Sequence, residues 1–400
     1  MKAILIVFLA VFCLAVQADE DRYLLLGDFL PELAREIGPN ELVYAEGGVS
    51  LVRVPVSQVE QFSRIVHDHY KACGGFMDVT HEIRKGRSAA RLVWEYADPK
   101  DSGFEFAVRG DAFVADMVSM VSKDAYWNVL KSLEAMGSRS ATNAKGAAAQ
   151  KWIQGQATEL TSGMPNVRVW TVETDHFFAN KQASVVLTLE GTQPNLPAVV
   201  LGAHMDTITQ SFTSDKQPGA DDDGSGSALL LETLRVLKQS GAKFERTVHL
   251  VWYAAEEWGL VGSQFVVDAF VDKGLAVDAV LQFDMVGYNS SADNDNIYLL
   301  TDYTNPALTE TLRRIIETYT DAKVGTTECG YACSDHASWH KKGFAAAVPF
   351  EASFSNMNGR LHTQNDKTDV LDVDHAIRFV KSAVAFVGEV GRVLPPQPKH

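Results

Sequence analysis

The sequence has no excess of positive charge. Its 36 Lys and Arg residues are outnumbered by 51 Asp and Glu residues, which gives a formal net charge of -15 at pH 7. Proteins that bind nucleic acid present a basic surface to the phosphate backbone, so this composition argues against nucleic acid as a partner. Acidity of this size favours solubility instead.

Long apolar runs are also lacking. The longest candidate, residues 3–16, is shorter than the roughly 20 apolar residues that a membrane span needs. It follows the positively charged Lys2 and leads into Val-Gln-Ala at residues 16–18, a small-residue cleavage site. Residues 1–18 are therefore predicted to be a secretory signal peptide, with an N-terminal membrane anchor as the alternative. We expect a secreted protein with no membrane domain.

Cysteine is scarce as well. Of the four Cys residues, Cys13 lies in the predicted leader and Cys73 stands alone. Cys329 and Cys333 are close enough to form a disulfide, which an exported protein can keep, and their spacing also occurs in metal sites. Closed structural zinc sites are usually rich in cysteine, so a metal-stabilised structural protein is disfavoured.

What the sequence does contain divides it into two parts. Residues 23–104 are predicted to form a small α/β unit, with a helix at 57–73 and strands within 92–108. From about residue 116 to 393, apolar strands alternate with helices, which predicts an α/β fold with a mostly parallel central sheet flanked by helices. The Pro-rich residues 394–400 are predicted to be a tail.

Three apolar strands of the larger part run directly into residues that bind metal ions. AVVLGA is followed by His204, HLVWYAA by Glu256 and Glu257, and AVLQF by Asp284. In open α/β sheets, ligands bind at the carboxyl ends of the strands. A single acidic residue after a strand is ordinary, because strands end in turns. His, Glu and Asp after three different strands are harder to explain as turn residues alone.

Two loops carry further candidates. Three consecutive carboxylates, Asp221, Asp222 and Asp223, precede a predicted helix. One would serve as an N-cap, but three repel one another unless a cation lies nearby. His362 stands in the string RLHT, where a lone surface histidine would be the simpler interpretation if it were considered alone.

Taken together, these residues suggest a zinc site. Imidazole mixed with carboxylates suits zinc, whereas calcium and magnesium prefer oxygen ligands alone. Five ligands are too many for one tetrahedral ion with an open position, so two ions that share a bridging carboxylate fit better. Asp206 is then expected to contact His204 and fix its tautomer. Of the two adjacent glutamates, one would be a ligand and the other the general base.

From about residue 124 to 393, the sequence resembles the secreted bacterial and fungal leucyl aminopeptidases, which are co-catalytic zinc enzymes. The resemblance rests on the strings GAHMDT, PGADDDGSG, WYAAEEWGLVGS, QFDMVGY, LTDYT, CGYACSDHASWH, PFEA and RLHT. Each string alone is weak, but their order and spacing together are highly specific. The resemblance implies a zinc exopeptidase fold, two Zn²⁺ ions per chain, a monomer, and peptide substrates with a free N-terminus.

The resemblance also assigns roles to matching positions. It implies that His204 and Asp284 hold one zinc ion and that Glu257 and His362 hold the other. Asp222 would bridge the two ions. It makes Glu256 the general base and places Tyr331 where it can help to hold the oxyanion. It further implies a cis peptide bond between Asp222 and Asp223, and a disulfide between Cys329 and Cys333.

The same resemblance predicts specificity and regulation. The apolar substrate pocket of the family, which suits a bulky first residue such as Leu, maps onto Met285, Leu300, Val348, Phe350, Phe354, Met357 and Leu361. Met357 stands where the family more usually has an aromatic residue. Residues 19–115 resemble the removable prosegment of the family, which would act as an intramolecular inhibitor and folding aid.

Three alternatives remain from the sequence. A carboxypeptidase or a glutaminyl cyclase would use a similar zinc site, but CGYACSDHASWH and the apolar pocket favour an aminopeptidase. A non-catalytic binding domain would be expected to have lost ligands or the base, which are all present. The remaining histidines are interpreted as structural. His336 and His340 are four residues apart on a predicted helix, but Ala337 stands where a zincin helix needs Glu, and His249 lies within a predicted buried strand.

Overall fold

The computed structural model describes residues 21–27, 41–59, 61–63, 75–97, 103–174, 182–208, 216–293 and 296–396. The predicted signal peptide, and most of the helix predicted at 57–73, lie outside these ranges. Within them, no helix is long and apolar enough to cross a membrane.

A six-stranded sheet lies at the centre of the larger part, in the order β13-β10-β7-β9-β6-β5. In that order the strands are Ala346–Ala347, Val277–Gln282, Ala198–His204, Val248–Tyr253, Ser184–Leu189 and Val167–Val172. The first four are parallel, whereas β6 and β5 pair antiparallel at one edge. The mostly parallel sheet is confirmed, and the antiparallel edge is an addition to it.

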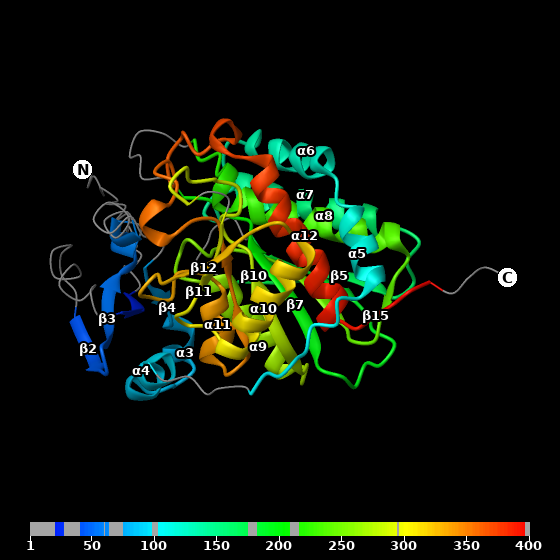
Figure 1. Ribbon diagram of the computed structural model, residues 1–400. Coiled ribbons are helices and arrows are strands. Elements are labelled where there is room, and N and C mark those ends of the chain that lie inside the picture. Colours follow the sequence, from blue (N-terminus) through cyan, green and yellow to red (C-terminus); the bar gives the residue numbers. More distant parts are fainter. Residues whose placement is uncertain are drawn as a thin grey trace, which may run out of the picture.

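Helices cover both faces of this sheet (Figure 1). Successive strand residues point to opposite faces, so Val199 and Leu201 of β7 pack in one apolar core and Val200 in another. The first core is covered by α5 (Ala112–Ser119), α6 (Lys123–Glu134), α7 (Ala144–Leu160), α8 (Gly226–Ser240), α10 (Pro306–Tyr319) and α12 (Val373–Val390). The second is covered by α9 (Val261–Asp272) and α11 (His336–Lys341).

Two small sheets complete the larger part. One has the order β12-β11-β14, formed by Val324–Thr327, Ile297–Leu300 and Pro349–Phe350. The other pairs β8 (Lys243–Phe244) with β15 (Val393–Leu394), so the start of the predicted tail is held in a strand. Helix α5 spans the predicted boundary at residue 115, and its Val114 and Met117 lie in the first core.

The N-terminal unit has a four-stranded antiparallel sheet in the order β2-β3-β1-β4. Its strands are Glu41–Glu46, Val49–Pro55, Asp21–Leu26 and Met77–Asp78, followed by helices α3 (Thr80–Arg84) and α4 (Ala89–Ala97). The strands predicted within residues 92–108 do not occur in residues 92–97, which are helical, or in residues 103–108, so the prediction is wrong for the described part of this range. Leu92, Val93 and Tyr96 are buried at helical spacing against the sheet, so the apolar residues of this segment follow the period of a helix and not that of a strand.

The two units share one apolar cluster. Leu24 and Leu26 of β1 lie in the same buried cluster as Tyr331 and Met285 of the larger part. Polar contacts join the units as well: the backbone N–H of Asp78 donates to the carbonyl of Gly259 at 2.9 Å. The N-terminal unit therefore packs beside the loop that follows Glu256 and Glu257.

Candidate metal centre

The metal-binding candidates gather because three of their strands are neighbours. Strands β10, β7 and β9 lie side by side and parallel, so their carboxyl ends meet at one edge of the sheet. His204 is the last residue of β7, Glu256 and Glu257 follow β9, and Asp284 follows β10. Sequence reasoning placed these strand ends correctly.

Asp222 reaches the same edge from a loop. It lies in the segment η1 (Ala220–Ser225), where the backbone angles of Asp222 and Asp223 are not helical. The peptide bond between Asp222 and Asp223 is cis, as the resemblance implied. One carboxylate oxygen of Asp222, Oδ1, lies 3.0 Å from Nε2 of His204. The other oxygen, Oδ2, lies 2.9 Å from Nε2 of His362. A single carboxylate thus faces two histidines from different parts of the chain.

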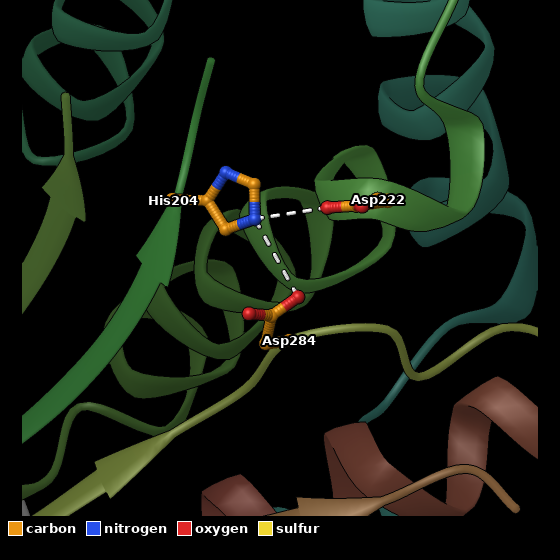
Figure 2. Close-up of side chains that lie close together, drawn as sticks. All are labelled: His204, Asp222 and Asp284. Carbon is orange, nitrogen blue, oxygen red and sulfur yellow. Dashed lines mark ion pairs between the residues drawn. The ribbon is translucent and has the colours of Figure 1, made fainter. Parts of the chain in front are cut away.

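Each histidine has a further carboxylate of its own. Nε2 of His204 lies 3.5 Å from Oδ1 of Asp284, and Figure 2 shows His204 directed at both Asp222 and Asp284. Nε2 of His362 lies 3.1 Å from Oε2 of Glu257. In each of the two groups, His204 with Asp222 and Asp284, and His362 with Asp222 and Glu257, the ligand atoms lie within 4.8 Å of one another.

These two groups fit zinc by their environment as well as by ligand type. All five residues are only 1–3% exposed. Oε1 of Glu257 is buried and has no hydrogen-bond partner among the described residues. Burial and the charge of Asp222 raise the pKa of Glu257 to about 7. Buried carboxylates of like charge are costly unless a cation compensates them, and imidazole with carboxylate is a ligand set of zinc.

Glu256 lies farther from the histidine that it faces than Glu257 does. Its Oε2 lies 4.0 Å from Nε2 of His204, and its Oε1 has no hydrogen-bond partner among the described residues. Burial raises the pKa of Glu256. The backbone N–H of Glu256 donates to Oδ1 of Asp206 at 3.0 Å, and the same oxygen lies 3.5 Å from Nδ1 of His204. Asp206 therefore links the histidine to the glutamate, beyond the contact that sequence reasoning expected.

A narrow apolar cavity opens beside Asp284. Tyr331 lies in its wall with five of the seven predicted pocket residues, which are Met285, Leu300, Val348, Phe350 and Phe354. Met357 and Leu361 belong to the same apolar cluster but do not line the cavity. Cys329 and Cys333 form the disulfide that the resemblance implied, and Tyr331 lies between them in the chain.

The three consecutive aspartates point to different partners. Asp221 accepts hydrogen bonds from the side chain of Asn358 at 2.8 Å and from the backbone of Gly287 at 3.1 Å. Asp223 accepts a hydrogen bond from the backbone N–H of His204 at 2.9 Å. Only Asp222 faces the histidines, so the flanking aspartates hold the loop in place.

Other contributors to the site were missed by sequence reasoning. The carboxylate of Asp366 accepts hydrogen bonds from the backbone N–H groups of Asp221 and Asp222, at 3.0 and 3.1 Å. Arg139 is completely buried beside the same loop. Asp366 could have been suspected from its place four residues after His362, whereas no local pattern marks Arg139.

The remaining histidines lie away from these two groups. His249 is buried in β9, where its Nδ1 lies 3.0 Å from Oγ1 of Thr188, and burial lowers its pKa to about 3. His336 is buried in α11, and burial lowers its pKa to about 3 as well. Neither belongs to the groups of potential metal ligands. Their structural interpretation therefore agrees with the geometry.

The model of peptidase family M28 matches residues 184–387 of the chain. The probable leucine aminopeptidase of Arthroderma benhamiae is 32% identical over 364 residues, which are 89% of this chain and 90% of that protein. The crystal structure of the Legionella pneumophila LapA aminopeptidase has 33% identity and a TM-score of 0.83, over 94% of this chain and 99% of that one. The crystal structure of LapB from Legionella pneumophila has 30% identity and a TM-score of 0.85, over 93% of this chain and 100% of that one.

The family match includes the strands whose carboxyl ends carry the histidine and carboxylate groups. The relatives resemble the chain over most of its length, including the small N-terminal unit. The fold is that of a zinc exopeptidase. The chain therefore belongs to peptidase family M28 and is a zinc-dependent aminopeptidase.

Proposed function

We propose that the chain is a secreted aminopeptidase that uses two zinc ions to remove bulky apolar residues from the N-termini of peptides. The observation that carries this proposal is the carboxylate of Asp222, whose two oxygens lie 3.0 and 2.9 Å from the imidazoles of His204 and His362. A carboxylate that serves two groups of ligands is the arrangement expected of a bridging ligand in a two-metal hydrolase.

Six residues would take part in the reaction at the centre. One ion would be held by His204, Asp222 and Asp284, and the other by Asp222, Glu257 and His362. Zinc bound there would polarise the scissile carbonyl and lower the pKa of a water molecule. Glu256, whose Oε1 has no hydrogen-bond partner among the described residues, would take the proton from that water as general base.

The proposed substrate preference rests on the cavity beside Asp284. Its lining includes Met285, Leu300 and Phe350, which suit an apolar side chain. The acidic residue in the lining, Asp284, would be committed to a zinc ion and would not serve as the partner of a lysine side chain. Tyr331 lies in the same wall and would donate a hydrogen bond to the developing oxyanion. The first residue of the peptide, preferably Leu, would occupy this cavity.

Residues 19–115 would act as a prosegment and intramolecular inhibitor. In the full chain, His204 and Glu256 are each 1% exposed. A β-carbon added to Gly27 would lie 3.7 Å from that of Tyr331, so the end of β1 packs against the loop that carries Tyr331. This position supports the proposal that the N-terminal unit limits the access of substrate to the metal centre until the unit is removed. The predicted signal peptide would direct the chain out of the cell.

A substrate panel tests the proposed reaction. Leucyl anilide should be hydrolysed much faster than lysyl or aspartyl anilide, and acetyl-leucyl anilide should not be hydrolysed, because a free N-terminus is required. The panel also includes a carboxypeptidase substrate and an N-terminal glutaminyl peptide. Release of the C-terminal residue would favour a carboxypeptidase, and cyclisation of the glutaminyl peptide would favour a cyclase. Either result without leucyl-anilide hydrolysis contradicts the proposal.

A further inference from the structure

Arg139 is an arginine with no exposed surface, in the segment between α6 and α7. Its guanidinium donates three hydrogen bonds to backbone carbonyls. Nε donates to Met205 at 2.9 Å, Nη1 to Pro218 at 2.6 Å and Nη2 to Gly219 at 2.8 Å. Arg139 lies before residues 184–387, which match the family model.

The three carbonyls belong to two loops that carry proposed zinc ligands. Met205 directly follows His204, and Gly219 stands three residues before Asp222. The guanidinium therefore connects the loop of one ligand to the loop of another. These two ligands are the ones whose side chains approach to 3.0 Å.

The backbone of Arg139 is also fixed on both sides. Its N–H donates to Oγ1 of Thr207 at 2.9 Å, and its carbonyl accepts a hydrogen bond from Nε2 of Gln182 at 3.2 Å. Thr207 lies on the same loop as His204. The hydrogen bond from Gln182 anchors the arginine outside the two ligand loops, and the one to Thr207 adds a second contact with the loop that follows His204.

The loop that carries Asp222 is shaped to approach this guanidinium. Gly219 has a φ of +53°, and a β-carbon at this position would come within 2.3 Å of Cγ2 of Thr207. The same β-carbon would lie 3.1 Å from Nη2 of Arg139. Glycine therefore allows the loop to close tightly around Arg139.

The charge of Arg139 supports the same role. Among the described ion pairs, Arg139 has no carboxylate partner at direct contact distance; its donors go to backbone oxygens instead. Burial lowers its pKa, while the negative charges of Asp366 and Asp223 raise it. A buried positive charge close to these acids reduces the repulsion between their negative charges.

We propose that Arg139 is a positioning residue of the zinc centre, which holds the loops of His204 and Asp222 at the separation that lets both side chains bind one ion. The inference rests on the proposed two-zinc function. Lysine would not replace the arginine, because a single ammonium group lacks the planar fork that reaches carbonyls on two loops. The role belongs to a residue outside the segment matched by the family model.

The test compares R139M and R139K with the wild type, and with R313M as a matched control. Arg313 also donates to a backbone carbonyl, that of Val324 at 2.9 Å, but lies on α10 away from the ligand loops. Zinc Kd is measured by competition with a chelator, and Tm is measured for the zinc-free and zinc-loaded protein. Loss of a residue that orients ligands typically weakens metal binding about 10–100-fold.

The proposal expects zinc Kd to rise about 10–100-fold in R139M. Zinc should also raise the Tm of R139M less than that of the wild type, whereas R313M should bind zinc normally. A purely structural role would lower the Tm of the zinc-free R139M but leave the zinc Kd unchanged, and that result overturns the proposal. If R139M does not fold, R139K decides by the same two measurements. Absence of zinc binding by the wild type would instead overturn the proposed function.

Discussion

At the level of single residues, we propose different roles for the neighbours Glu256 and Glu257 because their side chains face different histidines. Oε2 of Glu257 lies 3.1 Å from Nε2 of His362, whereas Oε2 of Glu256 lies 4.0 Å from Nε2 of His204. In the proposed reaction, Glu257 would therefore be a metal ligand, and Glu256 would remain available to accept a proton. The backbone N–H of Glu256 is fixed by Asp206, which limits its movement.

The change of Glu256 to Gln separates these roles. E256Q keeps the shape of the side chain but removes the base, so kcat for leucyl anilide should fall by about 10²–10⁴-fold. Bound zinc, counted by atomic absorption, and Tm should stay close to the wild-type values. E317Q, on the exposed surface of α10, is the control and should keep full activity. Turnover of E256Q near the wild-type rate would remove Glu256 from the mechanism.

At the scale of helices and strands, the larger part was predictable because its strands are apolar and bounded by clear helical periodicity. Parallel neighbours bring their carboxyl ends together, so ligands from β7, β9 and β10 could be placed in one site from the sequence. Arg139 could not be placed, because its partners are backbone carbonyls of distant loops and leave no mark on the sequence.

The smaller unit was harder to predict. Helix α4 contains Val93, Trp94 and Tyr96, residues that favour strands, and its helical state follows from packing on the sheet of the unit. The cavity also differs in detail from its expected lining, since Met357 and Leu361 belong to the same apolar cluster but do not line it. Contacts between distant segments decide both cases.

Helix α3 provides a prediction at this scale. Glu82 of α3 lies 2.9 Å from Nζ of Lys341 in α11, and both side chains are at most 3% exposed. In E82A the lysine would lose this buried partner, which typically costs about 3–5 kcal/mol. R91A removes a surface ion pair of α4 and should cost about 0–1 kcal/mol. Urea unfolding of both variants measures the difference; equal losses would show that the buried pair does not anchor α3.

The same contact predicts a dependence on acid. Burial alone would raise the pKa of Glu82, but the charges of Lys341 and Lys342 lower it to about 2, from an ordinary value of 4.5. A lowered pKa stabilises the folded form above pH 4.5, and this contribution is lost as pH falls towards 2. The difference in stability between wild type and E82Q should therefore shrink across this range. A constant difference in urea unfolding between pH 5 and pH 2.5 would contradict the assignment.

At the scale of the whole molecule, the two units share the apolar cluster that contains Tyr331. If the N-terminal unit restricts the access of substrate to the metal centre, cleavage should activate the precursor. A protease site inserted at the exposed Gly103 would allow this cleavage. Cleavage there leaves α5, with its buried Val114, attached to the main core. Leucyl-anilide hydrolysis should rise as the small fragment is removed. Full activity of the uncut, leaderless precursor would show that the unit is not an inhibitor.

In the proposed function, Asp222 joins two zinc sites into one catalytic centre. The most direct test counts zinc in dialysed wild type and D222A, and follows leucyl-anilide hydrolysis as a chelator removes the metal and zinc restores it. We expect two zinc ions per wild-type chain, reversible loss of activity on chelation, and weakened binding at both sites in D222A, because both groups of ligands include Asp222. A single zinc ion in the fully active wild type, or two tightly bound ions in D222A, would contradict this account.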